Sequence, residues 1–385
     1  GSILQFVDGR FQVGPDSAGA DPGPACYRRG GPLTVTDANL LLGRIQERWF
    51  PNVFGPGGDA ALDRCVVEDG FDALATRIRA ETDRTLLPEE VAEGYLRIAV
   101  DRMAQAIKQI SVQRGHDVTE YALSCFGGAG GQHACAGADA LGIRKVLIHP
   151  LAGVLSAYGM GLAELRYIVH RSIEVTLDQS TVTTLRDSFA AAAKDAIGHL
   201  SEQGADPSRI RTEQRVMIRY EGTDTPLEVP FGSLEEMRQA FDMAHRKQFG
   251  FRDDRGRIIE SIAVEAIAEG ESEAADFGVD SRQSPGKPLV ESRVYENGRW
   301  RQVPTWRRSD LPLQQQLEGP LLVIEDNATT LIGSDWNGHV DDLGHLVLAR
   351  ASSASDSLKV TAAADPIMLE VFNNLFMHIA EQMGV

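Results

Sequence analysis

A glycine-rich run between two apolar segments is the feature that most restricts how this chain can fold. The stretch CFGGAGGQHACAGADALGIRKVLIHP extends from Cys125 to Pro150. Four glycines and an alanine follow the apolar segment YALSCF, then comes a segment of small residues compatible with a helix, and then the apolar segment KVLIHP. This order predicts a strand, a side-chain-poor turn, a helix and a second strand. Such a unit is typical of an α/β domain with a mostly parallel sheet.

Two explanations of the glycine run follow from the residues alone. Glycines after a strand allow backbone N–H groups to approach a phosphate or a nucleotide, and the dipole of the following helix adds to the affinity for an anion. A tight structural joint between strand and helix requires small residues as well. FGGAGG does not fit the GxGxxG dinucleotide pattern cleanly, and it lacks the Lys and Ser/Thr of a P-loop. The residues alone leave both explanations open.

Composition excludes several classes of protein. The 385 residues, 43% of them hydrophobic, allow two or three cores, and the net charge of −17 disfavours a partner made of nucleic acid. No apolar run of about 18 residues predicts a membrane span, and GSILQFVDGRF at the N-terminus does not have the pattern of a signal peptide. The four scattered cysteines predict neither a metal site nor a disulfide framework. We therefore expect reduced thiols and a cytoplasmic location.

The rest of the chain alternates between helical and strand-like patterns. Asp37 is expected to cap a short helix that carries Leu40, Leu41 and Ile45. Helical periodicity continues over 88–114, 154–165, 181–203 and 235–249. A hairpin is expected around Gly222, and short strands are expected from 292 to 350 with turns at Asn297-Gly298, Asn337-Gly338 and Leu343-Gly344. Residues 351–364 have linker composition, and an amphipathic helix capped by Asp365 is expected to follow.

Four stretches resemble the hydantoinase A / 5-oxoprolinase family. Two are similar to its long signatures, GPDSAGADPGPACYRRGGPLTVTDANLLLGRI and LSCFGGAGGQHACAGADALGIRKVLIHPLAGVLSAYGMGLAE. RYEGTDTPLEV and GPLLVIEDNATTLIGSDWNGHVDDLGHLVL resemble its C-terminal domain, and ADPIMLEVFNNLFMHIAEQMG resembles the start of the hydantoinase B partner. The resemblance implies an α/β part followed by a β-rich α+β part. Residues 1–170 would be the C-terminal portion of an actin-like ATPase (ribonuclease H-like) domain, 171–350 a C-terminal mixed domain, 351–364 a linker, and 365–385 the first helix of hydantoinase B.

The resemblance also implies ATP and Mg²⁺ as cofactors. In actin-like ATPases, two apolar residues followed by Gly-Gly-Ala form the motif that contacts adenosine, and CFGGAGG matches it. The residues expected to let the nucleotide lie against the backbone are Gly127, Gly128, Ala129, Gly130 and Gly131. His133 would lie near the nucleotide in the first turn of the next helix; without the resemblance, it would be interpreted as a capping or solvated histidine.

The TDAN motif gives two candidate catalytic residues, Asp37 and Asn39. The resemblance implies that they face the active cleft, where a carboxylate could orient the substrate or a magnesium–nucleotide complex. The alternative is that Asp37 only caps a helix and that Asn39 lies on the surface. Cys26 has no recognisable base beside it in the sequence, so we interpret it as structural.

The activity that the resemblance implies is the ATP-dependent opening of the lactam 5-oxo-L-proline to L-glutamate, a step of glutathione metabolism. Phosphorylation of the amide oxygen creates a leaving group, and a hydantoinase B part, fused or separate, would complete the hydrolysis. Alternatives are an N-methylhydantoinase subunit, an acetone carboxylase β-type subunit, or a scaffold segment without chemistry; a homo-oligomer is left open. The family's Asp-Gly-Gly-Thr phosphate loops are not in this sequence. We therefore expect an internal fragment of a larger polypeptide, inactive by itself.

Overall fold

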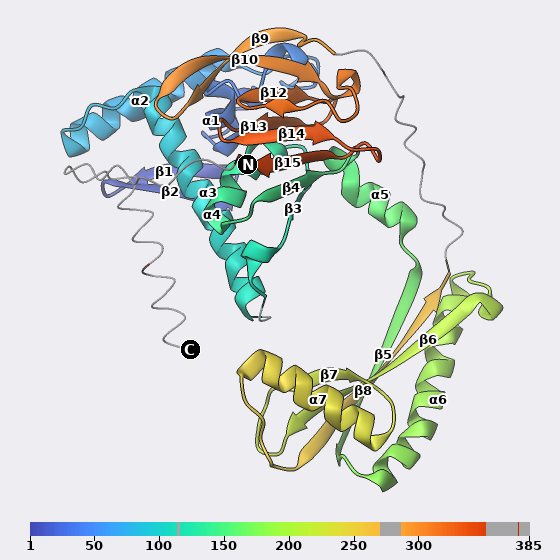
Figure 1. Cartoon of the computed structure of the whole chain (residues 1–385). Coiled ribbons are helices and arrows are strands. Elements are labelled where there is room, and N and C mark those ends of the chain that lie inside the picture. Colours follow the sequence, from blue (N-terminus) through green and yellow to red (C-terminus); the bar gives the residue numbers. More distant parts are fainter. Residues whose placement is uncertain (114–115, 270–285, 352–375, 377–385) are drawn as a thin grey trace. The chain divides into compact units, whose positions relative to one another are not determined.

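The computed structural model describes residues 1–113, 116–269, 286–351 and 376. These residues divide into two compact units (Figure 1). Unit 1 comprises the described residues of 1–112, 117–155 and 277–385, and unit 2 those of 113–116 and 156–276. Within the described part of the chain, no helix is both long enough and apolar enough to cross a membrane. Apart from residues 351 and 376, the predicted linker and C-terminal helix lie outside the described residues.

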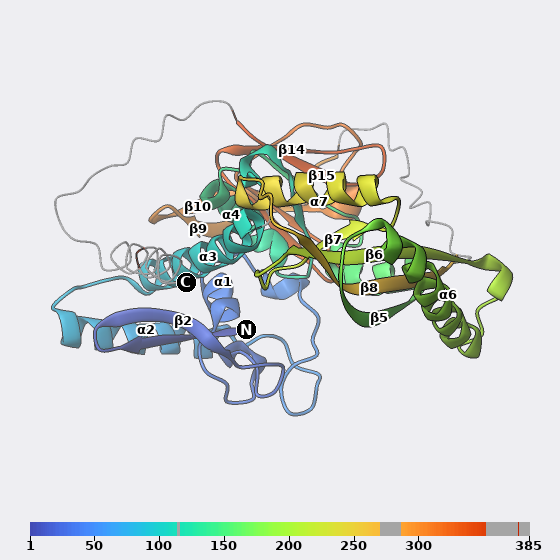
Figure 2. The ribbon, with the colours of Figure 1, turned by 90° about the horizontal axis from the view of Figure 1, so that it is seen from below.

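The first part of unit 1 is a hairpin packed with three helices. The hairpin is formed by β1 (Ser2–Val7) and β2 (Arg10–Ser17), and the helices are α1 (Val35–Leu41), α2 (Arg64–Thr82) and α3 (Pro88–Gln113). Figure 2 shows the hairpin beside α2. One core joins these elements and includes Phe6, Phe11, Phe71 and Tyr95. Helix α3 begins at Pro88, as predicted, because proline needs no hydrogen-bond partner in the first turn.

Asp37 does not cap α1 in the predicted way. The N-cap is Thr34, and Asp37 is the third helical residue, whose carboxylate returns to the N-cap backbone in a capping box. Of the two threonines in TVTD, Thr34 lies three residues before Asp37. This is the spacing of a capping box, so Thr34 is the N-cap.

A five-stranded sheet holds the glycine-rich run. Its order is β11-β14-β15-β4-β3. Strands β3 (Leu123–Cys125) and β4 (Lys145–Ile148) are parallel and flank α4 (Ala134–Leu141), which confirms the predicted strand–helix–strand unit. The expectation of a mostly parallel sheet is wrong, because within the described residues the other pairings are antiparallel. The free edge of β4 pairs with a returning hairpin strand instead; the remaining strands are β11 (Leu317–Glu318), β14 (Trp336–Val340) and β15 (Leu346–Arg350).

A second sheet of unit 1 has the order β13-β12-β10-β9. Asn297 and Gly298 connect β9 to β10 with φ of 54° and 76°, as predicted for a two-residue hairpin turn. The predicted turn at Asn337-Gly338 is wrong, because both residues lie inside β14, where Gly338 faces Leu348 of β15. The bounds of the four strands are β9 (Val290–Glu296), β10 (Arg299–Arg307), β12 (Leu321–Ile324) and β13 (Thr329–Ile332).

Unit 2 is a four-stranded antiparallel sheet with two helices. The order is β5-β8-β6-β7, and α6 (Gln179–Glu202) and α7 (Leu234–Phe249) share one core with the sheet (Figure 1). The helices begin and end within two residues of the predicted bounds. The hairpin expected around Gly222 is confirmed by the pairing of β6 with β7. The strands are β5 (Leu165–Thr176), β6 (Ile210–Tyr220), β7 (Leu227–Pro230) and β8 (Arg257–Ala268), and the short helix α5 (Leu155–Leu162) precedes β5.

The predicted division at residue 170 is therefore wrong. Strand β5 begins before this boundary and pairs with β8 of unit 2. The strands from 290 to 350 were expected to continue the domain that begins at 171, but they lie in unit 1, where β15 pairs with β4. The physical reason is the exposed edge that a short parallel pair leaves, which a later strand covers by forming a ladder.

Candidate functional site

The glycine turn lies where the parallel strands β3 and β4 end. Ligands of open α/β sheets bind at the carboxyl ends of such strands, so this position suits a binding site. The backbone N–H of Gly127 donates to the carbonyl of Ala152, 2.7 Å away, and thereby ties the turn to the segment that follows β4. A 3₁₀ turn, Gly130–Gln132, then leads into α4.

The glycines of the turn meet different surroundings. A Cβ on Gly128 would lie 2.6 Å from the carbonyl oxygen of Asn327, and one on Gly131 would lie 2.8 Å from that of Thr329. These two glycines are therefore required by the close approach of the segment from β12 to β13. Gly130 similarly meets the sulfur of Cys125 at 2.9 Å.

Gly127 differs from these glycines. Its φ is +90°, and a Cβ there would meet no heavy atom within 4 Å. Open space therefore adjoins its backbone, and glycine is favoured by the positive φ and not by packing. Phe126, the residue before it, is 58% exposed, and Ala129 is exposed as well. The outer side of the turn is thus Phe126, Gly127 and Ala129, and the inner side is Gly128 and Gly131.

Asp37 uses its carboxylate inside the protein. The side chain is fully buried and accepts hydrogen bonds from the backbone N–H groups of Ala25, Cys26 and Thr34, and from the Thr34 hydroxyl, at 2.7–3.2 Å. These four bonds occupy both oxygens and fasten the loop around Cys26 to α1. The geometry supports a structural role for Asp37. Burial, and after it the charge of Asp37, raise the pKa of the Cys26 thiol, which agrees with its interpretation as structural.

Asn39 and His133 come together although 94 residues separate them. The side-chain amide of Asn39 donates to the carbonyl of Val35 at 3.0 Å and lies 3.2 Å from Nε2 of His133. With the amide nitrogen as donor, Nε2 accepts and the imidazole proton is on Nδ1. Asn39 is 1% exposed and His133 8%, so neither is the surface residue of the alternative interpretation.

The charge state of His133 follows from its surroundings. Burial, and after it the charge of Arg44, lower its pKa to about 4, so the imidazole is neutral at neutral pH. Among the described residues, its Nδ1 and the Oδ1 of Asn39 have no hydrogen-bond partner. The pair therefore keeps one unused donor, the Nδ1–H group of His133, and one unused acceptor, Oδ1 of Asn39. Because the imidazole is already neutral, it does not act as an acid near pH 7.

Sequence reasoning missed two residues next to this pair. Arg44 and Gln132 are 8% and 5% exposed, and Arg44 donates to the carbonyl of Gln132 over 3.4 Å. An arginine directly after the apolar run LLLG was the available signal, because arginine is rarely buried without a partner.

A second group missed by the sequence lies at the end of β4. Arg308 donates to the carbonyls of Ile148 and Gly344, at 3.1 Å and 2.9 Å, and its Nη1 is 3.1 Å from Glu325. These bonds hold β4, the turn before β15 and the end of β12 together. Within the described residues, no three His, Cys, Asp or Glu side chains are grouped so as to hold a metal ion.

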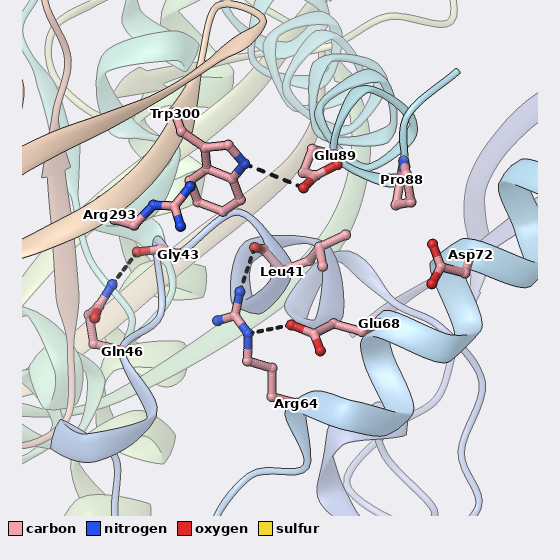
Figure 3. Close-up of a pocket in the computed structure, with 10 residues that line it drawn as sticks. All are labelled: Leu41, Gly43, Gln46, Arg64, Glu68, Asp72, Pro88, Glu89, Arg293 and Trp300. Carbon is pink, nitrogen blue, oxygen red and sulfur yellow. Dashed lines mark hydrogen bonds and ion pairs between the residues drawn. The ribbon is translucent and has the colours of Figure 1, made fainter. Parts of the chain in front are cut away.

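A pocket of about 560 Å³ lies elsewhere in unit 1, between α2, the start of α3 and the β9–β10 hairpin (Figure 3). Its polar groups are largely paired with one another. Arg64 bonds to the carbonyl of Leu41 at 3.1 Å and to Glu68 at 2.8 Å, and Trp300 donates to Glu89 at 3.3 Å. Among the residues that line it, none is a predicted site residue, so the glycine turn remains the candidate site; the lining residues are Leu41, Gly43, Gln46, Arg64, Glu68, Asp72, Pro88, Glu89, Arg293 and Trp300.

Comparison with known proteins gives one family and several relatives. Residues 1–169 match the family model described as hydantoinase/oxoprolinase. The whole chain is 35% identical to the 5-oxoprolinase PfmaA of Pestalotiopsis fici and 35% identical to the 5-oxoprolinase of Saccharomyces cerevisiae, and it covers 31% of each. It thus spans about a third of the length of these curated relatives.

A solved structure resembles the fold. The crystal structure of the ATP-dependent caprolactamase from Pseudomonas jessenii superposes with a TM-score of 0.73 at 26% sequence identity. The match covers 91% of this chain and 52% of that one. The mixed α/β architecture is therefore one that a solved enzyme shares.

Proposed function

The chain belongs to the hydantoinase/oxoprolinase family, and from this premise we propose that it forms the adenosine side of an ATP site in a longer enzyme. The enzyme would open the ring of 5-oxo-L-proline to give L-glutamate. The relatives named 5-oxoprolinase match this chain over its whole length, which supports the reaction class. The caprolactamase carries another lactam in its name, and cyclic amides are accordingly the proposed substrate class.

The open backbone at Gly127 is the observation that carries the nucleotide assignment. A positive φ, free space beside the α-carbon and a position at the carboxyl end of β3 are what close approach of a ligand to the backbone requires. Gly128, Gly130 and Gly131 would contribute by shaping the turn and not by direct contact, since parts of the chain already adjoin them. We assign the contact to Gly127 and Ala129.

The neutral His133–Asn39 pair would hold the glycine turn in position. His133 is the N-cap of α4, directly after the glycine turn, and its hydrogen bond to Asn39 links the turn to α1. We therefore assign positioning roles to both residues. Asp37 holds the loop around Cys26, so we no longer assign it a catalytic role. We expect the catalytic groups in the rest of the longer enzyme.

The cofactors and partners belong to the same proposal. When bound, ATP supplies the phosphoryl group that makes the amide oxygen a leaving group. The actin-like arrangement, Mg²⁺ as the counter-ion of the phosphates and a hydantoinase B part complete the proposed enzyme. The described residues offer the outer glycine turn for adenosine, and no cluster of carboxylates for the metal ion.

A matched pair of glycine variants tests the nucleotide contact. Gly9 has a φ of +74°, and its Cβ position is also empty, but it lies in the β1–β2 turn. Gly127→Val and Gly9→Val therefore impose a similar backbone strain, and only the first should obstruct a nucleotide. We expect calorimetric titration of the 385-residue chain with ATP to show binding that is at least tenfold weaker in Gly127→Val and unchanged in Gly9→Val. Equal affinities in the two variants would remove the assignment.

A further inference from the structure

A cavity of about 440 Å³ adjoins α3 and α4 in unit 1. Helices α3 and α4 lie next to each other in both ribbon views (Figures 1 and 2), and the cavity is closed by the turn between β13 and β14 and by the end of β9. Apolar side chains form part of its wall, among them Leu96, Val100 and Trp336. Five carboxylates and two guanidinium groups also line it; they are Glu93, Asp101, Asp139, Glu296, Asp335, Arg44 and Arg97.

Arg44 is buried in this wall, and one of its guanidinium nitrogens is unpaired among the described residues. It is 8% exposed, and within the described part of the chain its one hydrogen bond is the 3.4 Å contact to the carbonyl of Gln132. Its Nε has no hydrogen-bond partner among the residues that the structure describes, and the negative charges of Glu296 and Glu93 only partly offset the lowering of its pKa by burial. Because a guanidinium group does not lose its proton, a buried one requires an anion or a set of acceptors. The wall of the cavity therefore contains a buried guanidinium N–H group that lacks an acceptor among the described residues.

Gln132 presents the complementary group. Its Oε1 is buried and has no hydrogen-bond partner in the described part of the chain, and the residue is 5% exposed. Nearby carboxylates are fixed in place, since Glu296 accepts from the Ser334 hydroxyl at 2.6 Å and Glu93 accepts from the backbone N–H groups of Asn297 and Gly298. The same cavity thus contains fixed acceptors that suit a cation, and Arg44 is a donor that suits an anion.

We propose that this cavity binds a small zwitterion, an α-amino acid, with its carboxylate on Arg44 and its ammonium group between Gln132 and Glu296. A simple anion would be opposed by the carboxylates, and a simple cation by Arg44. A molecule that carries both charges on neighbouring atoms satisfies both orphaned groups at once. Charge-assisted hydrogen bonds of this kind are the strongest that side chains make.

The choice of amino acid rests on the proposed function, whereas the zwitterion chemistry does not. The lactam 5-oxo-L-proline carries a carboxylate but an uncharged ring nitrogen, and hydrolysis of its C–N amide bond creates an ammonium group and a second carboxylate. The cavity would therefore recognise the product, L-glutamate, and discriminate against the substrate. It adjoins the glycine turn through Gln132, but residues 126–131 do not line it, so failure of nucleotide binding at Gly127 would leave the proposal unaffected.

Three ligands separate the two charges in a calorimetric titration of the 385-residue chain without nucleotide. L-Glutamate carries both groups, glutarate lacks the ammonium group, and 5-oxo-L-proline has it blocked. We expect L-glutamate to bind at least tenfold more tightly than either of the others. Equal affinities for the three, or no binding of any, would overturn the proposal.

Variants then identify the residues. Arg44→Met should weaken L-glutamate at least tenfold, whereas Arg293→Met, which alters an arginine stacked on Trp300 outside the cavity, should not. Glu296→Gln should weaken L-glutamate and leave glutarate no weaker, because it removes a charge that only the ammonium group needs. If circular dichroism shows that Arg44→Met does not fold, Glu296→Gln decides, and an unchanged preference for L-glutamate over glutarate in that variant contradicts the proposal.

Discussion

The imidazole of His133 is kept neutral by its position. It is buried beside the guanidinium group of Arg44 and accepts a hydrogen bond from Asn39, and its pKa is lowered from 6.5 to about 4, chiefly by burial. In the unfolded chain the same group binds a proton near its ordinary pKa. Folding is therefore linked to pH through this residue.

We predict that the folded state loses stability as the pH falls from 6.5 towards 4. The unfolded chain binds the proton first, so the contribution of neutral His133 is complete above pH 6.5 and decreases below it. With a folded pKa of about 4, the loss is about 2 kcal/mol at pH 5. Urea unfolding at pH 7.5 and pH 5 measures it, and His133→Gln, which keeps a neutral polar side chain, is the control. If the two proteins show the same pH dependence, His133 is not the group that titrates.

Single residues were predicted only where their role is local. The structural interpretation of Cys26 needed only the sequence around it, and it agrees with a thiol whose pKa is raised by burial. The partner of Asn39 is a histidine 94 residues away, and no local pattern specifies such a contact. The burial of Gln132 was missed for the same reason, whereas the apolar run LLLG before Arg44 was a local signal for the burial of that arginine.

At the scale of elements, the glycine turn and the segment from β12 to β13 form one joint. The N–H of Thr329 donates to the carbonyl of Gly128 at 3.3 Å, and the carbonyl oxygen of Asn327 lies 2.6 Å from the position that a Cβ on Gly128 would take. A backbone carbonyl that is fixed in a turn cannot move aside at low cost. The turn is therefore shaped by its own chain on the inner side and is open on the outer side.

We predict that Gly128→Ala lowers the free energy of unfolding by about 1–3 kcal/mol, the usual cost of overpacking. The control is Gly137→Ala in α4, where a Cβ would meet nothing within 4 Å. It should raise the free energy of unfolding by about 0.5–1 kcal/mol, because alanine is the better helix former. Urea unfolding of both variants tests this. If Gly128→Ala is as stable as the parent chain, the close approach of Asn327 is not a constraint.

Helices whose ends carry capping residues were predicted well, but the pairing of strands with one another was not. Helix α7 lies within one residue of its expected range because Ser233 and Glu236 form a capping box and Gly250 ends the helix. The strand pattern near residue 348 was recognised, but nothing in it shows that β15 would pair with β4, about 200 residues earlier. Asn337-Gly338 failed as a turn because glycine there serves close packing against Leu348.

At the scale of the whole molecule, the two units differ in a way that spectroscopy can resolve. Each unit has hydrophobic cores of its own within the described residues. All four tryptophans lie in unit 1; they are Trp49, Trp300, Trp306 and Trp336. Tryptophan fluorescence therefore reports unfolding of unit 1, whereas far-UV circular dichroism also reports the helices α6 and α7 of unit 2.

We predict that Phe241→Ala destabilises unit 2 and leaves the fluorescence transition of unit 1 in place. Phe241 is fully buried and packs against Tyr220, with ring centroids 4.9 Å apart, so its removal should cost about 3–5 kcal/mol. The circular dichroism curve in urea should then show an earlier phase that the fluorescence curve lacks. Leu348→Ala in β15 is the reciprocal control, because Leu348 is fully buried in the core that contains Trp306 and Trp336, and it should shift the fluorescence transition. If Phe241→Ala shifts both curves equally, the two units unfold as one cooperative body, and separate cores do not make them independent.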